Sequence, residues 1–186
     1  QETGEPLIKI DWLQQSSEGL ICLSGGQRGH LGQALLSSNI NLAQKRVDYF
    51  KKIFDKDFFI EIHRVGRENE EEYNSLALNF AMDNNVALVA TNDVRFLGPT
   101  DPDDEAPSDF EVHEARVCIQ KGEVLSESTR SREHSEKQYF CTGEEMIEKF
   151  SDIPEAIHNT LSISGKCNLE LELGKFYLPD FEVPDH

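Results

Sequence analysis

The sequence predicts an α/β fold with parallel strands. Three short runs are almost entirely apolar and rich in Ile, Leu, Val and Phe, at residues 19–24, 58–62 and 86–90. Each run is about as long as a strand, and the lack of polar alternation indicates strands that are covered on both faces. Segments with helical periodicity separate the runs, so the order is β-α-β-α-β. That order favours right-handed parallel crossovers.

The two helical segments between these runs carry apolar residues on one face. The first segment has spacings of four, three and four, in Ala43, Val47, Phe50 and Phe54. The second segment repeats the pattern in Tyr73, Leu76, Ala77 and Phe80. Both are expected to pack against the sheet.

Three further helices are predicted after the third strand. A capping box at Ser108 and Glu111 opens the first, whose inward face is expected to hold Val112, Ala115 and Ile119. A second box at Thr142 and Glu145 opens a short helix with Met146, Ile147 and Phe150. A third begins near Ser151, tolerates Pro154 in its first turn, and is expected to face inward with Ile157 and Leu161. Residues 123–137 are polar and without periodicity, which predicts an irregular connection.

Length and charge limit the function. The 186 residues fit one domain, and 18 Lys+Arg against 35 Asp+Glu give a formal charge of -17. Such a surface repels phosphate backbones, so the chain is a poor candidate for holding DNA by itself. The acidity indicates either simple solubility or docking to a basic partner. We expect no membrane segment, because there is no long apolar run.

The ends and one internal loop carry further expectations. The N-terminus has none of the layout of a signal peptide, and both ends contain proline, so the chain is expected to be a piece of a longer protein. Residues 98–111 form an acidic stretch that spaces Asp101, Asp103 and Glu105 like a calcium loop. Ala106 stands where that loop needs glycine, so a solvated loop is predicted instead.

Functional groups in parallel α/β folds gather at the carboxyl ends of the strands. Asp93 is the sharpest candidate, because a carboxylate just past a buried strand can hold a divalent ion or act as a general base. Arg95 stands two residues on, where a second ligand would be placed. An arginine repels a cation, so a structural salt bridge between the two side chains is as well supported as catalysis.

Two other strand ends carry weaker signals. Glu61 and His63 share one face of a strand, which suits either two metal ligands or a polar strand end. Residues 24–29 are glycine-rich, but they lack the P-loop pattern, so a plain strand-to-helix turn is favoured over a phosphate cradle.

The remaining histidines and the cysteines give no motif. The histidines have no mutual ligand spacing and are interpreted as surface or satisfied side chains, at His30, His113, His134, His158 and His186. The cysteines form no C-x-x-C pair and are expected to be free thiols, at Cys22, Cys118, Cys141 and Cys167.

The chain resembles the family of bacterial replicative DNA polymerase III alpha subunits. The resemblance runs in order along the chain through EGLICLSGG (18–26), VALVATNDVRF (86–96), DFEVHEARVCI (109–119), DIPEAIHNT (152–160), KCNLEL (166–171) and KFYLPDF (175–181). It implies the later strands and helices of the PHP (polymerase and histidinol phosphatase) domain, a distorted seven-stranded α/β barrel. Residues 1–178 would be a partial PHP domain that lacks the N-terminal strands with their histidine-rich metal motifs. Residues 179–186 would lead toward the polymerase palm, and the uncovered sheet edge could promote self-association.

The resemblance also bears on the metal ligands. In metal-binding members a cysteine stands at the position of Gly26 and a histidine at that of Arg95, so Asp93 alone keeps the ligand type and is a vestigial ligand position. The resemblance therefore implies a degenerate PHP domain without catalytic residues or a cofactor in this segment. The alternative is a metal-dependent phosphoesterase that uses Asp93 with His63 and Glu61.

The resemblance further implies a place in a larger assembly. The segment would stabilise a cytoplasmic polymerase and dock the proofreading exonuclease, the epsilon subunit, within the polymerase III holoenzyme. Other domains of the parent chain would grip DNA and use Mg for template-directed synthesis.

Overall fold

The three apolar runs form a parallel sheet, as the sequence predicts. The computed structural model describes residues 8–99, 106–127, 129–130 and 132–176. Its strands are β1 (Cys22–Leu23), β2 (Phe58–Ile62) and β3 (Ala87–Ala90), in the spatial order β1-β2-β3. Both strand pairs are parallel. These findings confirm the α/β class with connecting helices, while the seven-stranded barrel stays a prediction.

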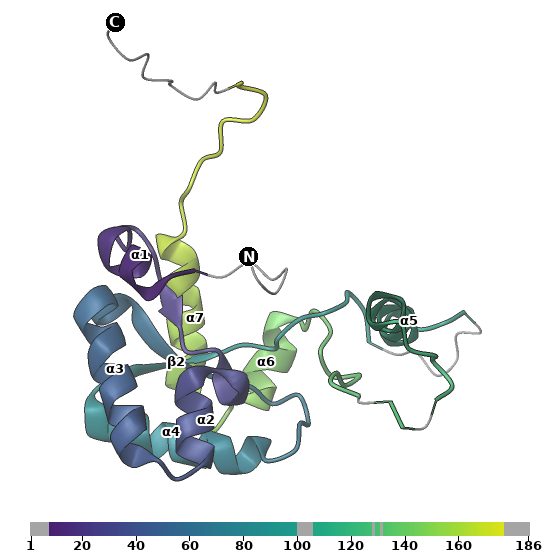
Figure 1. Ribbon diagram of the computed structural model, residues 1–186, viewed down its shortest axis with the longest axis horizontal. Coiled ribbons are helices and arrows are strands. Elements are labelled where there is room, and N and C mark those ends of the chain that lie inside the picture. The colour runs from purple at the N-terminus through teal and green to yellow at the C-terminus, as the bar shows by residue number, and fades with distance from the viewer. Residues whose placement is uncertain (1–7, 100–105, 128, 131, 177–186) are drawn as a thin grey trace, which may run out of the picture.

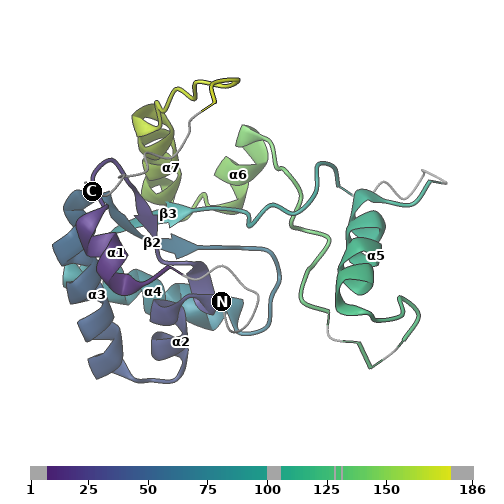
Figure 2. The same cartoon turned by 45° about the horizontal axis from the view of Figure 1, so that its top comes forward.

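Helices cover both faces of the sheet (Figure 2). After α1 (Ile10–Gln15), the crossovers contain α2 (His30–Leu36), α3 (Ile40–Phe54) and α4 (Glu70–Asn84), with short 3-10 turns at Gly26–Arg28 and Asp55–Asp57. These three crossover helices lie on one side. On the other side α7 (Pro154–Lys166) packs along β3, and α6 (Gly143–Lys149) precedes it. The central strand β2 is therefore covered on both faces, which is why it lacks polar alternation, whereas Leu23 of β1 is exposed.

The core is built from the predicted helix faces. Ala43, Val47 and Phe54 of α3 are buried, and so are Tyr73, Ala77 and Phe80 of α4. Phe50 and Leu76 are partly buried against the same cluster. Periodicity of 3.6 residues thus located the inward faces of both crossover helices.

The chain leaves this body after β3 and carries α5 (Asp109–Lys121) away from the sheet (Figure 1). We call residues 91–142, between β3 and α6, the α5 excursion, and its last part, residues 122–142, the return segment. Both predicted capping boxes are present, at Ser108 and at Thr142. The predicted inward face of α5 is wrong, because Val112 and Ile119 are exposed while Glu114 and Cys118 are buried. The reason is spatial: α5 has no apolar sheet beside it to receive Val112 and Ile119.

Exposure also corrects the two last helices. Ile147 of α6 is 59% exposed, so it does not face inward as expected. In α7, Ile157 packs against the core as expected, but Leu161 is 68% exposed, so its predicted inward position is wrong. Phe150, directly after α6, is fully buried and fixes that helix instead. In the described parts of 123–137 there is no helix or strand, as predicted.

Several other expectations have plain outcomes. The four cysteines are free thiols. None of the helices in the described ranges is both long and apolar enough to cross a membrane. The predicted linker 179–186, the acidic residues at 101, 103 and 105, and the prolines at 6, 179 and 184 lie outside the described residues.

Candidate functional site

The predicted candidates meet where the parallel strands end. Glu61, His63, Arg67, Asp93 and Arg95 form one group of contacting charged and polar side chains, here called the strand-end cluster. Four of the five were singled out in the sequence. Arg67 was not singled out. Its guanidinium contacts both His63 and Asp93, and so links the Glu61–His63 pair to the Asp93–Arg95 pair.

Glu61 is the innermost carboxylate of the strand-end cluster. It accepts hydrogen bonds from the Thr91 hydroxyl at 2.6 Å and the Gly25 N–H at 3.1 Å, and its Oε1 lies 3.3 Å from His63 Nε2. Burial disfavours the charged form, but the contacts with His63, Thr91 and Gly25 outweigh it and lower the pKa of Glu61. Glu61 is therefore ionised and already saturated with donors.

The Gly25 contact also decides the glycine-rich turn. Its N–H, one of the donors that a phosphate would need, is directed at Glu61. The segment is a strand-to-helix turn, as favoured by the sequence, with a carboxylate of the protein itself against its backbone.

His63 is buried between Glu61 and Arg67. Arg67 Nη1 lies 3.4 Å from His63 Nδ1, and a guanidinium only donates, so Nδ1 accepts. The ring proton then sits on Nε2, which faces the Glu61 carboxylate. Both ring nitrogens are thus engaged.

Asp93 is enclosed by donors. Arg67 Nη2 donates to its Oδ2, Arg95 Nη2 donates to Oδ1 at 2.9 Å, and Gln138 Nε2 donates to Oδ2 at 3.0 Å. Burial opposes ionisation, but the hydrogen bond and charge of Arg67, with the charge of Arg95, hold the pKa of Asp93 below its ordinary value. The salt bridge predicted between Asp93 and Arg95 is confirmed, and Arg67 is the more buried partner, with a side chain 8% exposed against 41% for Arg95.

Gly26 lies under the His63 ring. A Cβ built at Gly26 would lie 2.4 Å from His63 Cε1, and the backbone there has a φ of +58°. A side chain such as cysteine would need both a strained backbone and a displaced His63 ring. The position to which the resemblance assigns a lost ligand is therefore occupied by an imidazole.

The first turn of α4 holds this arrangement in place. Glu70 accepts hydrogen bonds from the N–H groups of Val65 and Gly66, both at 2.9 Å, and Asn74 donates to the His63 carbonyl at 2.7 Å. These bonds shape the loop between β2 and α4 so that Arg67 turns back over the strand end. No sequence motif marks Arg67, because its position depends on this loop.

The charges of the strand-end cluster cancel. Two carboxylates, Glu61 and Asp93, face two guanidiniums, Arg67 and Arg95, around His63. Arginine is always charged and cannot accept or ligate. The arrangement binds these side chains to each other, and donors of the protein engage both oxygens of each carboxylate.

A second cluster contradicts the interpretation of the histidines. His113 and Glu114 of α5 meet His134 of the return segment, and one ligand-type atom from each lies within 4.8 Å of the other two. We call these three residues the α5 cluster. The interpretation of His113 and His134 as surface or satisfied side chains is wrong, because His113 Nε2 and His134 Nδ1 are buried without a hydrogen bond among the described residues. Burial, with His113 and Arg95 nearby, lowers the pKa of His134. His30 and His158 are exposed as expected, and His186 lies outside the described residues.

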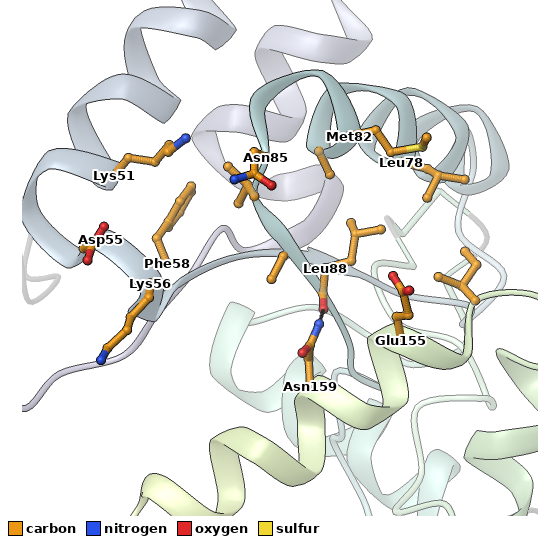
Figure 3. A pocket seen from close by; sticks show the side chains of 14 residues that line it. Lys51, Asp55, Lys56, Phe58, Leu78, Met82, Asn85, Leu88, Glu155 and Asn159 are labelled. Carbon is orange, nitrogen blue, oxygen red and sulfur yellow. Dashed lines mark hydrogen bonds between the residues drawn. The ribbon is translucent and has the colours of Figure 1, made fainter.

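A pocket of about 550 Å³ lies at the opposite, amino-terminal ends of β2 and β3 (Figure 3). Asn159 of α7 reaches across it and donates to the Leu88 carbonyl at 2.8 Å. Lys51 and Lys56 line it together with Asp55 and Glu155, so it has no single sign of charge. The hydrogen bond from Asn159 holds α7 to the sheet, and no catalytic groups converge among the residues that line the pocket.

Known proteins of similar sequence include DNA polymerase III alpha subunits. The PHP domain family matches residues 1–65. The chain is 42% identical over 185 residues, all of its length, to the DNA polymerase III subunit alpha of Pseudomonas aeruginosa. It is 42% identical over 180 residues to that of Escherichia coli K12 and 39% identical over 180 residues to that of Haemophilus influenzae, in each case 97% of the chain. The chain spans 15% of the length of each of these relatives.

Proposed function

The chain is homologous along its whole length to the PHP region of bacterial DNA polymerase III alpha subunits, and we propose that it serves such a polymerase as a non-hydrolytic scaffold and docking surface. It would stabilise the polymerase and dock the proofreading exonuclease, the epsilon subunit. Template-directed DNA synthesis with Mg, in the cytoplasm, is proposed for the whole protein, whose other domains would contact the DNA.

The position of Arg67 at the centre of the strand-end cluster supports the proposal that the segment does not hydrolyse phosphoesters. Its guanidinium contacts both Asp93 and His63, two of the three side chains that a metal-dependent phosphoesterase would use. A divalent ion there would have to displace a buried cation. We propose that the strand-end cluster holds no metal and that positive side chains replace its structural effect.

The charge of the chain supports a docking role over contact with nucleic acid. At -17, the surface repels DNA and attracts basic protein surfaces. If this segment docks a protein and other domains bind the DNA, a polymerase segment can be strongly acidic.

Hydrolysis by the full polymerase subunit that carries this segment tests the first part. The wild type is expected to release no more product from bis(p-nitrophenyl) phosphate with Mn²⁺ or Zn²⁺ than the Asp93→Asn variant does. Hydrolysis by the wild type that Asp93→Asn abolishes would overturn the proposal and support the phosphoesterase alternative, for which Glu61, His63 and Asp93 do lie together.

Cross-linking mass spectrometry tests the docking part without any mutation. The full subunit would be mixed with the exonuclease subunit and treated with a lysine-reactive cross-linker. Cross-links from the exonuclease to lysines of residues 1–186 are expected, and added salt is expected to reduce them. Cross-links confined to other parts of the subunit would contradict docking on this segment.

A further inference from the structure

We propose that His113, Glu114 and His134 form a binding site for a divalent transition-metal ion, most favourably Zn²⁺. The site lies in the α5 excursion, apart from the strand ends where the resemblance places ligands. It also departs from the expectation that this segment carries no cofactor. It does not depend on the proposed scaffold function.

Three buried ligand-type atoms of the α5 cluster lack hydrogen-bond partners among the described residues. His113 Nε2, Glu114 Oε1 and His134 Nδ1 are each buried with no hydrogen bond among the described residues. The side chains of Glu114 and His134 are only 5% and 10% exposed. Burying a polar atom without a hydrogen-bond partner destabilises the folded protein, so three such atoms in one place require an explanation.

The geometry brings the three side chains together. His134 Nδ1 lies 3.6 Å from Glu114 Oε1, and one ligand-type atom from each of the three residues lies within 4.8 Å of the other two. Zinc bonds of about 2.1 Å place tetrahedral ligand atoms roughly 3.4 Å apart. The 3.6 Å between His134 Nδ1 and Glu114 Oε1 is close to this value, and the 4.8 Å limit for the group is within about 1.5 Å of it.

A proton shared between His134 and Glu114 explains the α5 cluster less well than a metal ion does. Protonation of His134 would give Nδ1 a donor role toward Glu114, but His113 Nε2 would still lack a partner. The two rings meet edge to face with centroids 4.7 Å apart, so protonating both would place like charges in contact. One metal ion satisfies all three atoms at once.

The ligand types and a neighbouring arginine define the ion. Two imidazoles and a carboxylate suit Zn²⁺ and related transition metals, whereas Ca²⁺ and Mg²⁺ prefer oxygen ligands. Arg130 Nη1 donates to Glu114 Oε2 at 2.5 Å, so it holds one oxygen and leaves Oε1 for the metal. This is the role of outer partners that orient a carboxylate ligand.

Both histidines line pockets. A metal ion bound there would hold α5 to the return segment. His134 lines a pocket of about 600 Å³, and His113 lines another of about 390 Å³. Within the described chain, α5 packs extensively on no other helix or strand. An ion shared by α5 and the return segment would fasten the excursion at a point where apolar burial is scarce.

Zinc binding by the full polymerase subunit tests the proposal. Chelator-treated protein would be titrated with Zn²⁺ and then analysed by mass spectrometry for bound metal. We expect one zinc per chain assigned to this site, and at least tenfold weaker binding in His113→Ala and in His134→Ala. His158→Ala is the matched control, since His158 is exposed on α7, and it is expected to bind as the wild type does.

A measurement on the unmutated protein covers the case in which the variants fail to fold. X-ray absorption at the zinc edge is expected to show nitrogen and oxygen neighbours, including imidazole rings. A bound zinc without imidazole neighbours would overturn the proposal. So would equal zinc affinity in folded His113→Ala, in folded His134→Ala and in the wild type. Unchanged zinc binding in Asp93→Asn is expected, and it separates this site from the strand-end cluster.

Discussion

The strand-end cluster and the α5 cluster contain similar residue types in opposite states. At the strand ends, two arginines neutralise Glu61 and Asp93, and both nitrogens of His63 have neighbours. In the α5 cluster, one arginine pairs with one oxygen of Glu114, and three ligand-type atoms have no hydrogen bond among the described residues. Both clusters pair a carboxylate with an arginine, so charge alone does not separate them. They differ in hydrogen bonding: donors reach both oxygens of Glu61 and of Asp93, whereas Glu114 Oε1 accepts none from the described residues.

The largest expected effect concerns the buried arginine of the strand-end cluster. Arg67→Met keeps the apolar stem but removes the charge that faces Asp93, so unfolding should become easier by about 3 kcal/mol. Arg95→Met is the matched control, because Arg95 is 41% exposed and an exposed pair contributes about 0–1 kcal/mol. Urea denaturation of both variants measures the difference. Equal losses would mean that Arg67 does not close the cluster.

A glycine pair tests the contact between residue 26 and the histidine. Gly26→Ala is expected to lower the free energy of unfolding by about 2 kcal/mol, because it adds a clash with the His63 ring to backbone strain. Gly122 at the end of α5 has a similar positive φ and nothing within 4 Å of a built Cβ. Gly122→Ala therefore reports strain alone, at about 1 kcal/mol. If thermal unfolding shows the same loss for both, His63 does not fill the space over Gly26.

The base of the α5 excursion gives a smaller effect. The Asn92 amide donates to the carbonyls of Lys137 and Tyr139 at 2.7 and 2.8 Å, which ties the return segment to the sheet. Asn92→Ala should cost about 1–2 kcal/mol and speed hydrogen exchange in α5. The control Asn159→Ala removes one bond to Leu88 and is expected to leave exchange in α5 unchanged. Faster exchange in α5 with Asn159→Ala would contradict this division of the molecule.

The smallest effect is a dependence on pH. The pKa of Asp93 is lowered in the folded protein, so its ionised form adds stability above the ordinary aspartate pKa of about 3.9, and that contribution is lost as the pH falls below it. Asp93→Asn, which tolerates the positive φ at this position, should be less stable than the wild type at about pH 7 and approach it toward about pH 3. A stability difference that stays constant across this range would show that the carboxylate charge is not used.

The sequence predicted the strands and their helices well, because both depend on local periodicity. Residues 58–62 form a strand as expected, and the buried positions of α3 and α4 follow the predicted spacing. It also predicted the pairing of Asp93 with Arg95, which are two residues apart. These features are decided within short windows of the chain.

What the sequence did not show depends on distant segments. Arg67 reaches Asp93 only because Glu70 shapes the loop before α4, and nothing in the loop sequence announces that turn. The inward face of α5 was wrong because Glu114 is buried by Arg130 and His134, which come from the return segment. The spacing of apolar residues cannot indicate a helix face that is buried through charged contacts.

Hydrogen-bond donors of the protein close the strand-end cluster, whereas three ligand-type atoms of the α5 cluster have none among the described residues. Crystals of the whole protein that carries this segment, soaked in Zn²⁺ and measured by anomalous X-ray diffraction at the zinc edge, test the consequence for metal binding most directly. The account predicts, within this segment, a peak between His113, Glu114 and His134 and no peak beside Asp93. A peak bound by Asp93, His63 and Glu61, with the Arg67 side chain displaced, would contradict it.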